Sequence, residues 1–597
     1  MKLRNLIKIM GLVCFFLAAP VGADIKLVAK VDQTAAGFPS HFSYKDLKEP
    51  VIGPSGHVAF AGLAFDGRTY TKAVWAGLPG ELEAIIKEND TITGFPGNVF
   101  FSDVVPPSTF LISRSGAVAF SAKLKGAIPR NTALVYRNGV TQGILKATDQ
   151  APGFPPGTVV GEVTPLAISD AGVVLGGTVG GTAISSAMWF WDYEKVERIS
   201  TTIGDCYYFS IAAYVPGLVS INQTGNVVFN AVLSRGDEKI CSSGGVFKWN
   251  NGNTELVIKD GDPVPGMPEA VFGVSLADSP PKINDLDEII FNAKLIQMTT
   301  PRSTNNSVWV KSGLNEPRLL ILSGEGLKEK PDQIIFSSVF SIPILDFNHA
   351  SFGYSMLPVI ANGLDVLLAG KPREIQPYDD PKGTGATQLT TIAAKNDQPS
   401  GFDPSWYYNI FSNRAINNAE QYVFTGYSAN ALERRSVFAM WRGTGTERPR
   451  LIAQDGMKCS INNVEYILRD IDLFPAKAVT SSTAGGQSSW FSDNGEIVFR
   501  ASLNNSSNLA ILLITDDSKE QKIFSLAEEI FPEHFSPSNM DNQLLEGFVY
   551  RYYPNTKTYI GIKNGEVFVL GGPFGSSPQR IDTVDNTLQF LENLAGS

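Results

Sequence analysis

The sequence predicts an all-β protein, a β-propeller of seven or eight four-stranded blades, followed by a small α+β domain. Three observations support this. A turn followed by a strand is written eight times, a short aromatic-rich strand recurs between the copies, and an incomplete repeat stands at each end of the repeated region. Antiparallel four-stranded units that close into a ring are typical of propellers, because closure hides the edge strands.

The repeated strand is clearest in "INQTGNVVFNAVL" at 221–233, where an aromatic residue follows the turn glycine by four positions. Alternation along a strand places Val227, Phe229 and Ala231 on one face, so the aromatic residue is expected to pack between sheets. Successive copies lie 53 to 75 residues apart. Four copies keep both residues, three replace the glycine, and one has Gly176 in the aromatic position: Gly56/Phe60, Gly116/Phe120, Gly225/Phe229, Gly495/Phe499, Asp287/Phe291, Asn348/Phe352, Glu420/Phe424 and Gly172/Gly176.

Other segments recur between these strands. One is the aromatic strand, as in "GVFKWNNG" at 245–252, whose Asn251-Gly252 pair is a hairpin signal because type I′ turns need positive φ. A partner strand then runs into a loop, as in "LVIKDGDPVPG" at 256–266, and a variable extended stretch follows. The segments 26–39 and 509–517 each look like half of a repeat. Their pairing would close a ring of blades.

The first 23 residues have the layout of a secretory signal peptide, with a cut after Ala23. Lys2, Arg4 and Lys8 precede a short apolar run that is too brief to span a bilayer. We therefore expect a propeller at 24–517, a C-terminal module at 518–597, and export to the periplasm or the cell exterior. No transmembrane segment is expected.

The net charge argues against one class of partner, and the cysteines allow one disulfide. The net charge of −10 becomes about −13 after removal of the signal residues, which argues against nucleic acid as a partner. Cys206 and Cys241 either form a disulfide in an oxidising compartment or remain isolated buried thiols, and Cys459 is then the odd cysteine.

The C-terminal region, 518–597, has a different pattern. Apolar residues at 523–531 approach helical spacing and Pro532 ends the pattern. Asn564-Gly565 marks a hairpin, and 583–594 reads as a closing helix. These features predict a small α+β unit that is long enough to fold alone.

The repeat "IN-x-x-G-x-V-x-F-x-A-x-L", the aliphatic-Trp strand and the "GDPVPG" loop together resemble a repeat of bacterial exported proteins of unknown function. The resemblance covers 26–517 and implies a β-propeller, but it implies no activity. The segments 526–537 and 550–575 resemble a separate small module that ends various bacterial secreted proteins.

Few residues suggest chemistry. A loop aspartate recurs as Asp32, Asp90, Asp149, Asp262 and Asp397. These carboxylates either form a ring that binds cations or close turns, and recurrence in many repeats favours turns. The repeated tryptophans either stack sugars or fill the core, and their fixed position favours the core: Trp75, Trp189, Trp191, Trp249, Trp309 and Trp441. The histidines His41, His57, His349 and His534 match no catalytic motif, so we predict no catalytic, cofactor-binding or metal-binding residue.

The sequence thus favours an exported monomeric scaffold that binds an unknown protein or glycan, without a cofactor. The long loops within 444–490 are the expected binding region. Two alternatives stay open: a periplasmic or secreted propeller enzyme, such as a glycan hydrolase or lyase, and a structural cell-surface component. A deep pocket with two unpaired carboxylates or a histidine would favour the enzyme.

Overall fold

The computed structural model describes most of the chain up to residue 515 and several strands beyond it. The described residues are 25–105, 110–126, 131–181, 186–199, 219–233, 243–274, 280–298, 303–322, 335–336, 346–347, 355–361, 364–370, 389–430, 432–462, 464–473, 490–504, 508–515, 542–545, 548–553, 558–563, 566–571 and 579–583. Their regular structure is β-strand throughout. A helix long and apolar enough to cross a membrane is absent from these residues.

Contacts divide the chain into two compact units, the first ending at Ile514 and the second beginning at Thr515. The predicted signal peptide, Cys206, Cys241 and the predicted helices at 523–531 and 583–594 lie outside the described residues. The described strands of the second unit form one antiparallel sheet in chain order: β39 (Asn542–Leu545), β40 (Phe548–Tyr553), β41 (Thr558–Lys563), β42 (Glu566–Gly571) and β43 (Gln579–Thr583). Strands β41 and β42 pair as the hairpin predicted around Asn564-Gly565.

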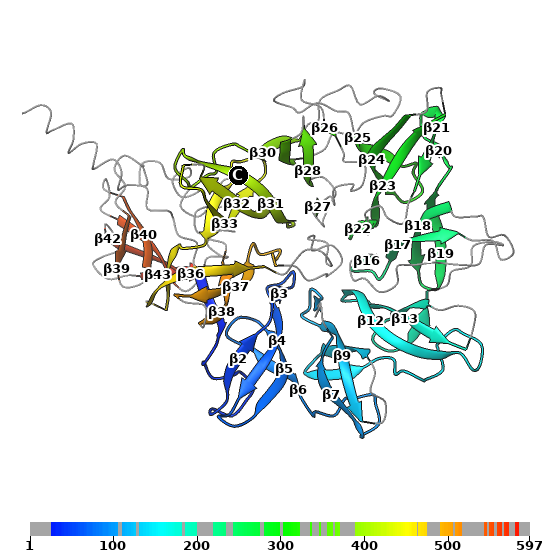
Figure 1. Ribbon diagram of the computed structural model, residues 1–597, viewed down its shortest axis with the longest axis horizontal. Coiled ribbons are helices and arrows are strands. Elements are labelled where there is room, and N and C mark those ends of the chain that lie inside the picture. Colours follow the sequence, from blue (N-terminus) through cyan, green and yellow to red (C-terminus); the bar gives the residue numbers. More distant parts are fainter. Residues whose placement is uncertain are drawn as a thin grey trace, which may run out of the picture. The chain divides into compact units, whose positions relative to one another are not determined.

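The described strands of the first unit form eight antiparallel sheets, which we number in chain order (Figure 1). Sheet 1 contains β2 (Ser43–Leu47), β3 (Val51–Ile52), β4 (Val58–Phe65), β5 (Tyr70–Gly77) and β6 (Glu83–Lys87). Sheet 2 contains β7 (Val99–Val104), β8 (Leu111–Ile112), β9 (Val118–Gly126), β10 (Asn131–Arg137) and β11 (Val140–Gly143). Sheet 3 contains β12 (Val159–Ser169), β13 (Gly172–Gly180), β14 (Ser186–Trp191) and β15 (Val196–Arg198). Sheet 4 contains β16 (Val219–Ile221), β17 (Val227–Leu233), β18 (Ser243–Asn250) and β19 (Asn253–Lys259).

The later sheets repeat this arrangement. Sheet 5 contains β20 (Pro263–Val264), β21 (Met267–Gly273), β22 (Lys282–Ile283), β23 (Glu288–Gln297), β24 (Ser303–Ser312) and β25 (Arg318–Leu322). Sheet 6 contains β26 (Ile335–Phe336), β27 (Asp346–Phe347), β28 (Ser355–Ala361), β29 (Leu364–Gly370) and β30 (Thr390–Ala394). Sheet 7 contains β31 (Trp406–Ile416), β32 (Gln421–Asn430), β33 (Arg435–Thr444) and β34 (Arg450–Gln454). Sheet 8 contains β1 (Ile25–Lys30), β35 (Lys458–Ile461), β36 (Val464–Asp472), β37 (Ile497–Leu503) and β38 (Leu509–Ile514).

Sheet 8 joins the two ends of the first unit. Its order is β1-β38-β37-β36-β35, and Ile25 pairs with Ile514. In Figure 1 the blue first strand lies beside the orange strands of this sheet. The pairing of the two half-repeats, expected from the sequence, is therefore confirmed.

The core lies between consecutive sheets. Buried side chains of sheets 1 and 2 form one cluster, and further clusters join sheets 2 and 3, 3 and 4, 4 and 5, 6 and 7, and 7 and 8. Another cluster joins sheet 8 to sheet 1. The repeated aromatic residue is buried wherever the structure describes it: Phe60, Phe120, Phe229, Phe291, Phe424 and Phe499. Its predicted packing role is confirmed.

The recurrent tryptophans also belong to the core. Trp75, Trp189, Trp249, Trp309 and Trp441 are each at most 1% exposed, which excludes them as open platforms for sugars. Three of them hold a loop in the same way. The indole N–H donates to the carbonyl of Ala36 (from Trp75, 2.9 Å), of Pro152 (from Trp189, 3.1 Å) and of Ser400 (from Trp441, 3.1 Å).

Sheet 3 corrects one alignment of the repeat. Trp189 pairs with Leu175, whereas in sheet 1 the corresponding tryptophan pairs with the aromatic Phe60. Leu175, and not Gly176, thus occupies the aromatic position, and it is fully buried. The reason is a turn that is one residue shorter, since Ser169 pairs directly with Gly172 across Asp170-Ala171.

Two of the recurrent loop aspartates close turns, whereas Asp32 accepts a hydrogen bond from the Lys45 side chain and Asp149 forms an ion pair with Lys146. Asp90 Oδ2 accepts the backbone N–H of Lys87 at 2.8 Å, and Asp262 Oδ2 accepts that of Lys259 at 2.9 Å. Within the described part of the chain, no three His, Cys, Asp or Glu side chains are grouped closely enough to hold a metal ion.

Candidate functional site

The turns that precede the repeated strand, which we call the repeat turns, have a buried serine or asparagine at their first position in six described sheets, and Gly53 takes this place in sheet 1. In sheet 4 the Gly225 N–H donates to the Asn222 carbonyl at 3.1 Å, and Gly225 has a φ of +85°, which suits glycine. Asn222 Oδ1 accepts the N–H groups of Thr224 (3.1 Å) and Asn226 (2.9 Å). The Asn of the "INQTG" motif is therefore a cap for its own turn.

The repeat turns of neighbouring sheets are hydrogen-bonded to one another. The backbone N–H of one turn donates to the next turn in five described cases: Ser115 to Asp170 Oδ1 (2.8 Å), Asp170 to Gln223 Oε1 (3.3 Å), Gln223 to Asp285 Oδ1 (3.0 Å), Asn418 to Asp493 Oδ1 (3.4 Å) and Asp493 to the Pro54 carbonyl (3.0 Å). Arg114 of sheet 2 also lies 3.7 Å from Asp285 of sheet 5 and from Asp493 of sheet 8. The turns of sheets far apart in the chain thus converge.

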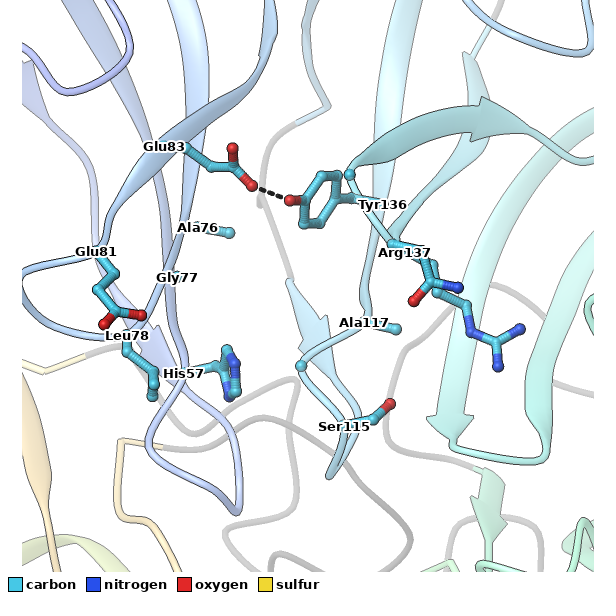
Figure 2. Close-up of a pocket in the computed structure, with 13 residues that line it drawn as sticks. His57, Ala76, Gly77, Leu78, Glu81, Glu83, Ser115, Ala117, Tyr136 and Arg137 are labelled. Carbon is cyan, nitrogen blue, oxygen red and sulfur yellow. Dashed lines mark hydrogen bonds between the residues drawn. The ribbon is translucent and has the colours of Figure 1, made fainter.

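Beside these turns, a cavity of about 370 Å³ lies between sheets 1 and 2 (Figure 2). Sheet 1 supplies His57, Glu81 and Glu83 to its lining, and sheet 2 supplies Ser115, Tyr136 and Arg137. The lining also contains the small residues Ala76, Gly77, Gly116 and Ala117, which leave room between the sheets. Its volume lies within the range of about 300 to 1,000 Å³ that is usual for small-molecule sites.

His57 is held at the edge of the cavity by its own turn. Its Nδ1 lies 2.9 Å from Ser55 Oγ, and its ring points toward the sheet 2 turn that carries Ser115 (Figure 2). A Cβ added to Gly116 would lie only 2.6 Å from His57 Nε2, so the glycine permits this close approach. Burial lowers the pKa of His57, against a smaller opposite effect of Glu81. The ring is therefore neutral at pH 7.

Two glutamates line the sheet 1 side. Glu83 accepts a hydrogen bond from the Tyr136 hydroxyl of sheet 2, which bridges the two walls (Figure 2). Burial, together with Glu83, raises the pKa of Tyr136 to about 12. The side chain of Glu81 makes neither a hydrogen bond nor an ion pair with another residue that the structure describes.

The cavity contains a histidine and two glutamates, which is the content expected of the enzyme alternative, but their arrangement suits hydrogen bonding to a ligand better than catalysis. A histidine base for hydrolysis is normally hydrogen-bonded to a carboxylate and to the nucleophile. Here Ser55 contacts His57 but does not line the cavity, and Glu81 makes no hydrogen bond to the imidazole. The free carboxylate, the imidazole and the Tyr136 ring instead offer a ligand several polar partners and one flat apolar surface.

Residues 15–349 match the model of a family of unknown function, DUF7453. The chain belongs to this family. The match covers sheets 1 to 5, and thus the whole cavity of this DUF7453 protein. No curated protein matches the sequence.

Several solved β-propeller and related structures are similar to this DUF7453 chain at low identity. The β-propeller domain of the trilobed protease from Pyrococcus furiosus is 11% identical, with a TM-score of 0.30, over 69% of this chain and 98% of that one. An uncharacterized protein from Listeria monocytogenes is 9% identical, with a TM-score of 0.30, over 68% and 96%. A polysaccharide lyase, an ulvan lyase, is 11% identical, with a TM-score of 0.27, over 69% and 91%.

Sequence reasoning placed the binding region elsewhere in this DUF7453 protein. Part of the expected loop region within 444–490 lies outside the described residues, as do His349 and His534. Cys459 is a free cysteine, and burial raises the pKa of its thiol to about 11. Glu81 and Glu83 were missed because they stand at positions that the repeats do not share. Tyr136 was missed for the opposite reason, since it occupies the place of Trp191 and Trp249 in the recurrent aromatic strand and resembles a core residue. The lack of repetition at the two glutamates was the available signal.

Proposed function

We propose that this protein is an exported binding protein that takes a small polar ligand into the cavity between sheets 1 and 2. Residues 24–517 form a closed propeller in which sheets 1 to 8 are the blades, and 518–597 form a separate module. The pairing of β1 with β38 and the hydrogen-bonded repeat turns support closure. The N-terminal 23 residues direct the chain to the periplasm or the cell exterior, where it acts as a monomer.

One observation carries the binding proposal: a cavity of ligand size contains a carboxylate, that of Glu81, without a protein partner among the described residues. A polar group in such a place loses hydrogen bonds to water when a ligand enters, so a ligand must offer it a replacement. Saccharides offer hydroxyl donors for this purpose and an apolar ring face for Tyr136. The proposed ligand is therefore a mono- or disaccharide, or the end of a glycan.

The experiment is calorimetric titration of residues 24–597 with a panel of neutral, acidic and amino mono- and disaccharides. We expect at least one to bind, and we expect Glu81→Gln to weaken binding at least fivefold. Glu465→Gln is the matched control, because Glu465 is an exposed strand glutamate that does not line the cavity. It should leave the affinity unchanged.

Two results would overturn the proposal. One is a panel in which no saccharide binds. The other is a saccharide whose affinity is insensitive to Glu81→Gln but is lost when the 474–489 segment is shortened, which would move the site to the loops originally expected. Release of a modified sugar during the titration would instead establish the alternative, a glycan-cleaving enzyme.

A further inference from the structure

The charge of the cavity is set by two glutamates on the same wall. Glu81 closes the turn that begins at Leu78, where its N–H donates to the Leu78 carbonyl at 2.8 Å, and Glu83 opens β6. Both side chains are exposed and line the cavity, with Glu83 directed toward Tyr136 and Glu81 toward Leu78 (Figure 2). Neither carboxylate forms an ion pair with a described residue. The hydrogen bond from Tyr136 to Glu83 comes from a neutral hydroxyl, and it leaves the negative charge of Glu83 in place.

The two basic residues of the lining do not neutralise these carboxylates. The Arg137 guanidinium lies 3.9 Å above the ring of Tyr193 in the neighbouring sheet 3 and extends away from the glutamates (Figure 2). His57 is neutral at pH 7 because its burial disfavours the charged form. The cavity is therefore negative on its sheet 1 wall, and it has no cation of its own placed against that wall.

We propose that the cavity selects a hydroxylated ligand that carries a protonated amine, such as an amino sugar with a free amino group. The ammonium group would lie on the sheet 1 wall, attracted by both Glu81 and Glu83, and the hydroxyls and the sugar ring would face His57 and Tyr136. This inference rests on the proposed function, because it specifies the ligand of the same cavity. A neutral sugar gains no ion pair there, and an acidic sugar is repelled.

The size of the preference follows from the exposure of the two glutamates. Partly solvated ion pairs are worth up to about 1 kcal/mol each, which corresponds to about fivefold in affinity for each carboxylate. That value is an upper limit, and at about 0.7 kcal/mol for each carboxylate the two together should favour the amine by roughly tenfold. Added salt should reduce this preference, because it screens exposed charges.

The test compares glucosamine, N-acetylglucosamine and glucose by titration at pH 7. These sugars share their ring, and acetylation removes the charge of the amine. We expect glucosamine to bind about tenfold more tightly than the other two, with the preference reduced to about twofold in the double variant Glu81→Gln/Glu83→Gln. Glu465→Gln should keep the full preference, and circular dichroism should show that every variant is folded.

The outcomes separate the two proposals. Equal binding of the three sugars, or tighter binding of N-acetylglucosamine, overturns the amine preference and leaves saccharide binding intact. A glucosamine preference that survives in the double variant also overturns it, since the charge would then act elsewhere. If none of these sugars binds, the amine inference fails, and the wider saccharide panel decides the proposed function independently.

Discussion

Replacing Asn222 tests how the repeat turns hold the sheets together. Asn222→Ala removes Oδ1, which accepts the N–H groups of Thr224 and Asn226, and Nδ2, which donates to the Asn284 carbonyl of sheet 5 at 3.2 Å. The chain supplies its own control. Serine occupies this turn position in other sheets, where Ser113 Oγ accepts the N–H of Ala117 at 3.2 Å and Ser492 Oγ that of Glu496 at 3.1 Å.

The magnitudes follow from burial. Thr224 is exposed, so its N–H can bond to water, but Asn226 is buried, and its unsatisfied N–H costs about 1 to 3 kcal/mol. Loss of the bond to sheet 5 adds about 1 kcal/mol. Asn222→Ala should therefore destabilise the protein by about 3 kcal/mol. Asn222→Ser, which keeps the acceptor and loses the bond to sheet 5, should cost about 1 kcal/mol.

The assay is urea unfolding of residues 24–597, followed by tryptophan fluorescence, with the midpoint compared at constant slope. The reasoning is refuted if the serine variant is as unstable as the alanine variant, because the cap would then contribute nothing. It is also refuted if the alanine variant loses less than about 1 kcal/mol, the low end of the cost of an unsatisfied N–H.

Three further predictions concern single contacts. Trp189→Phe removes the indole hydrogen bond to the Pro152 carbonyl and leaves a void, so urea unfolding should show a loss of about 2 to 3 kcal/mol; an unchanged midpoint would contradict the loop-holding role. Arg114→Ala should cost at most about 1 kcal/mol, because the Arg114 side chain is 43% exposed. Molar salt should abolish the difference in stability from wild type, whereas a salt-independent loss would argue against ion pairing. Gly116→Ala places a Cβ against His57 in a backbone with a φ of +87°, so it should lower the free energy of unfolding by about 1 to 2 kcal/mol and change the His57 titration measured by NMR. Gly67→Ala is the control, because its Cβ would meet no atom within 4 Å and the variant reports the cost of positive φ alone.

The repeated parts of the fold were predictable, because packing between sheets imposes the same demand in every repeat. Phe229 and Gly225 show this, since a position buried between sheets favours a large aromatic residue and a position with positive φ favours glycine. The shortened turn of sheet 3 was not predicted. The loss of one residue shifts the alignment of β13 with the other repeats, and Gly172 happens to stand where the turn glycine is expected.

The candidate site could not be predicted in the same way. Glu81 and Tyr136 come from different repeats, and only the packing of sheet 1 against sheet 2 brings them to one cavity. Nothing in the spacing of these residues marks them. His57 was noticed beside its turn, but its low pKa depends on burial by residues distant in sequence.

The place of β1 in sheet 8 also sets the order in which the fold can be completed. Strand β1 is synthesised first and its partner β38 last, because Ile25 pairs with Ile514. The growing chain therefore carries β1 unpaired through almost the entire synthesis of the first unit. During that time both β1 and the face of sheet 1 that packs on sheet 8 lack their partners. Exposed edges and apolar faces of this kind favour pairing between chains. A chain truncated before β38 should therefore be prone to aggregate with other copies, and synthesis of β38 removes this risk by pairing with β1.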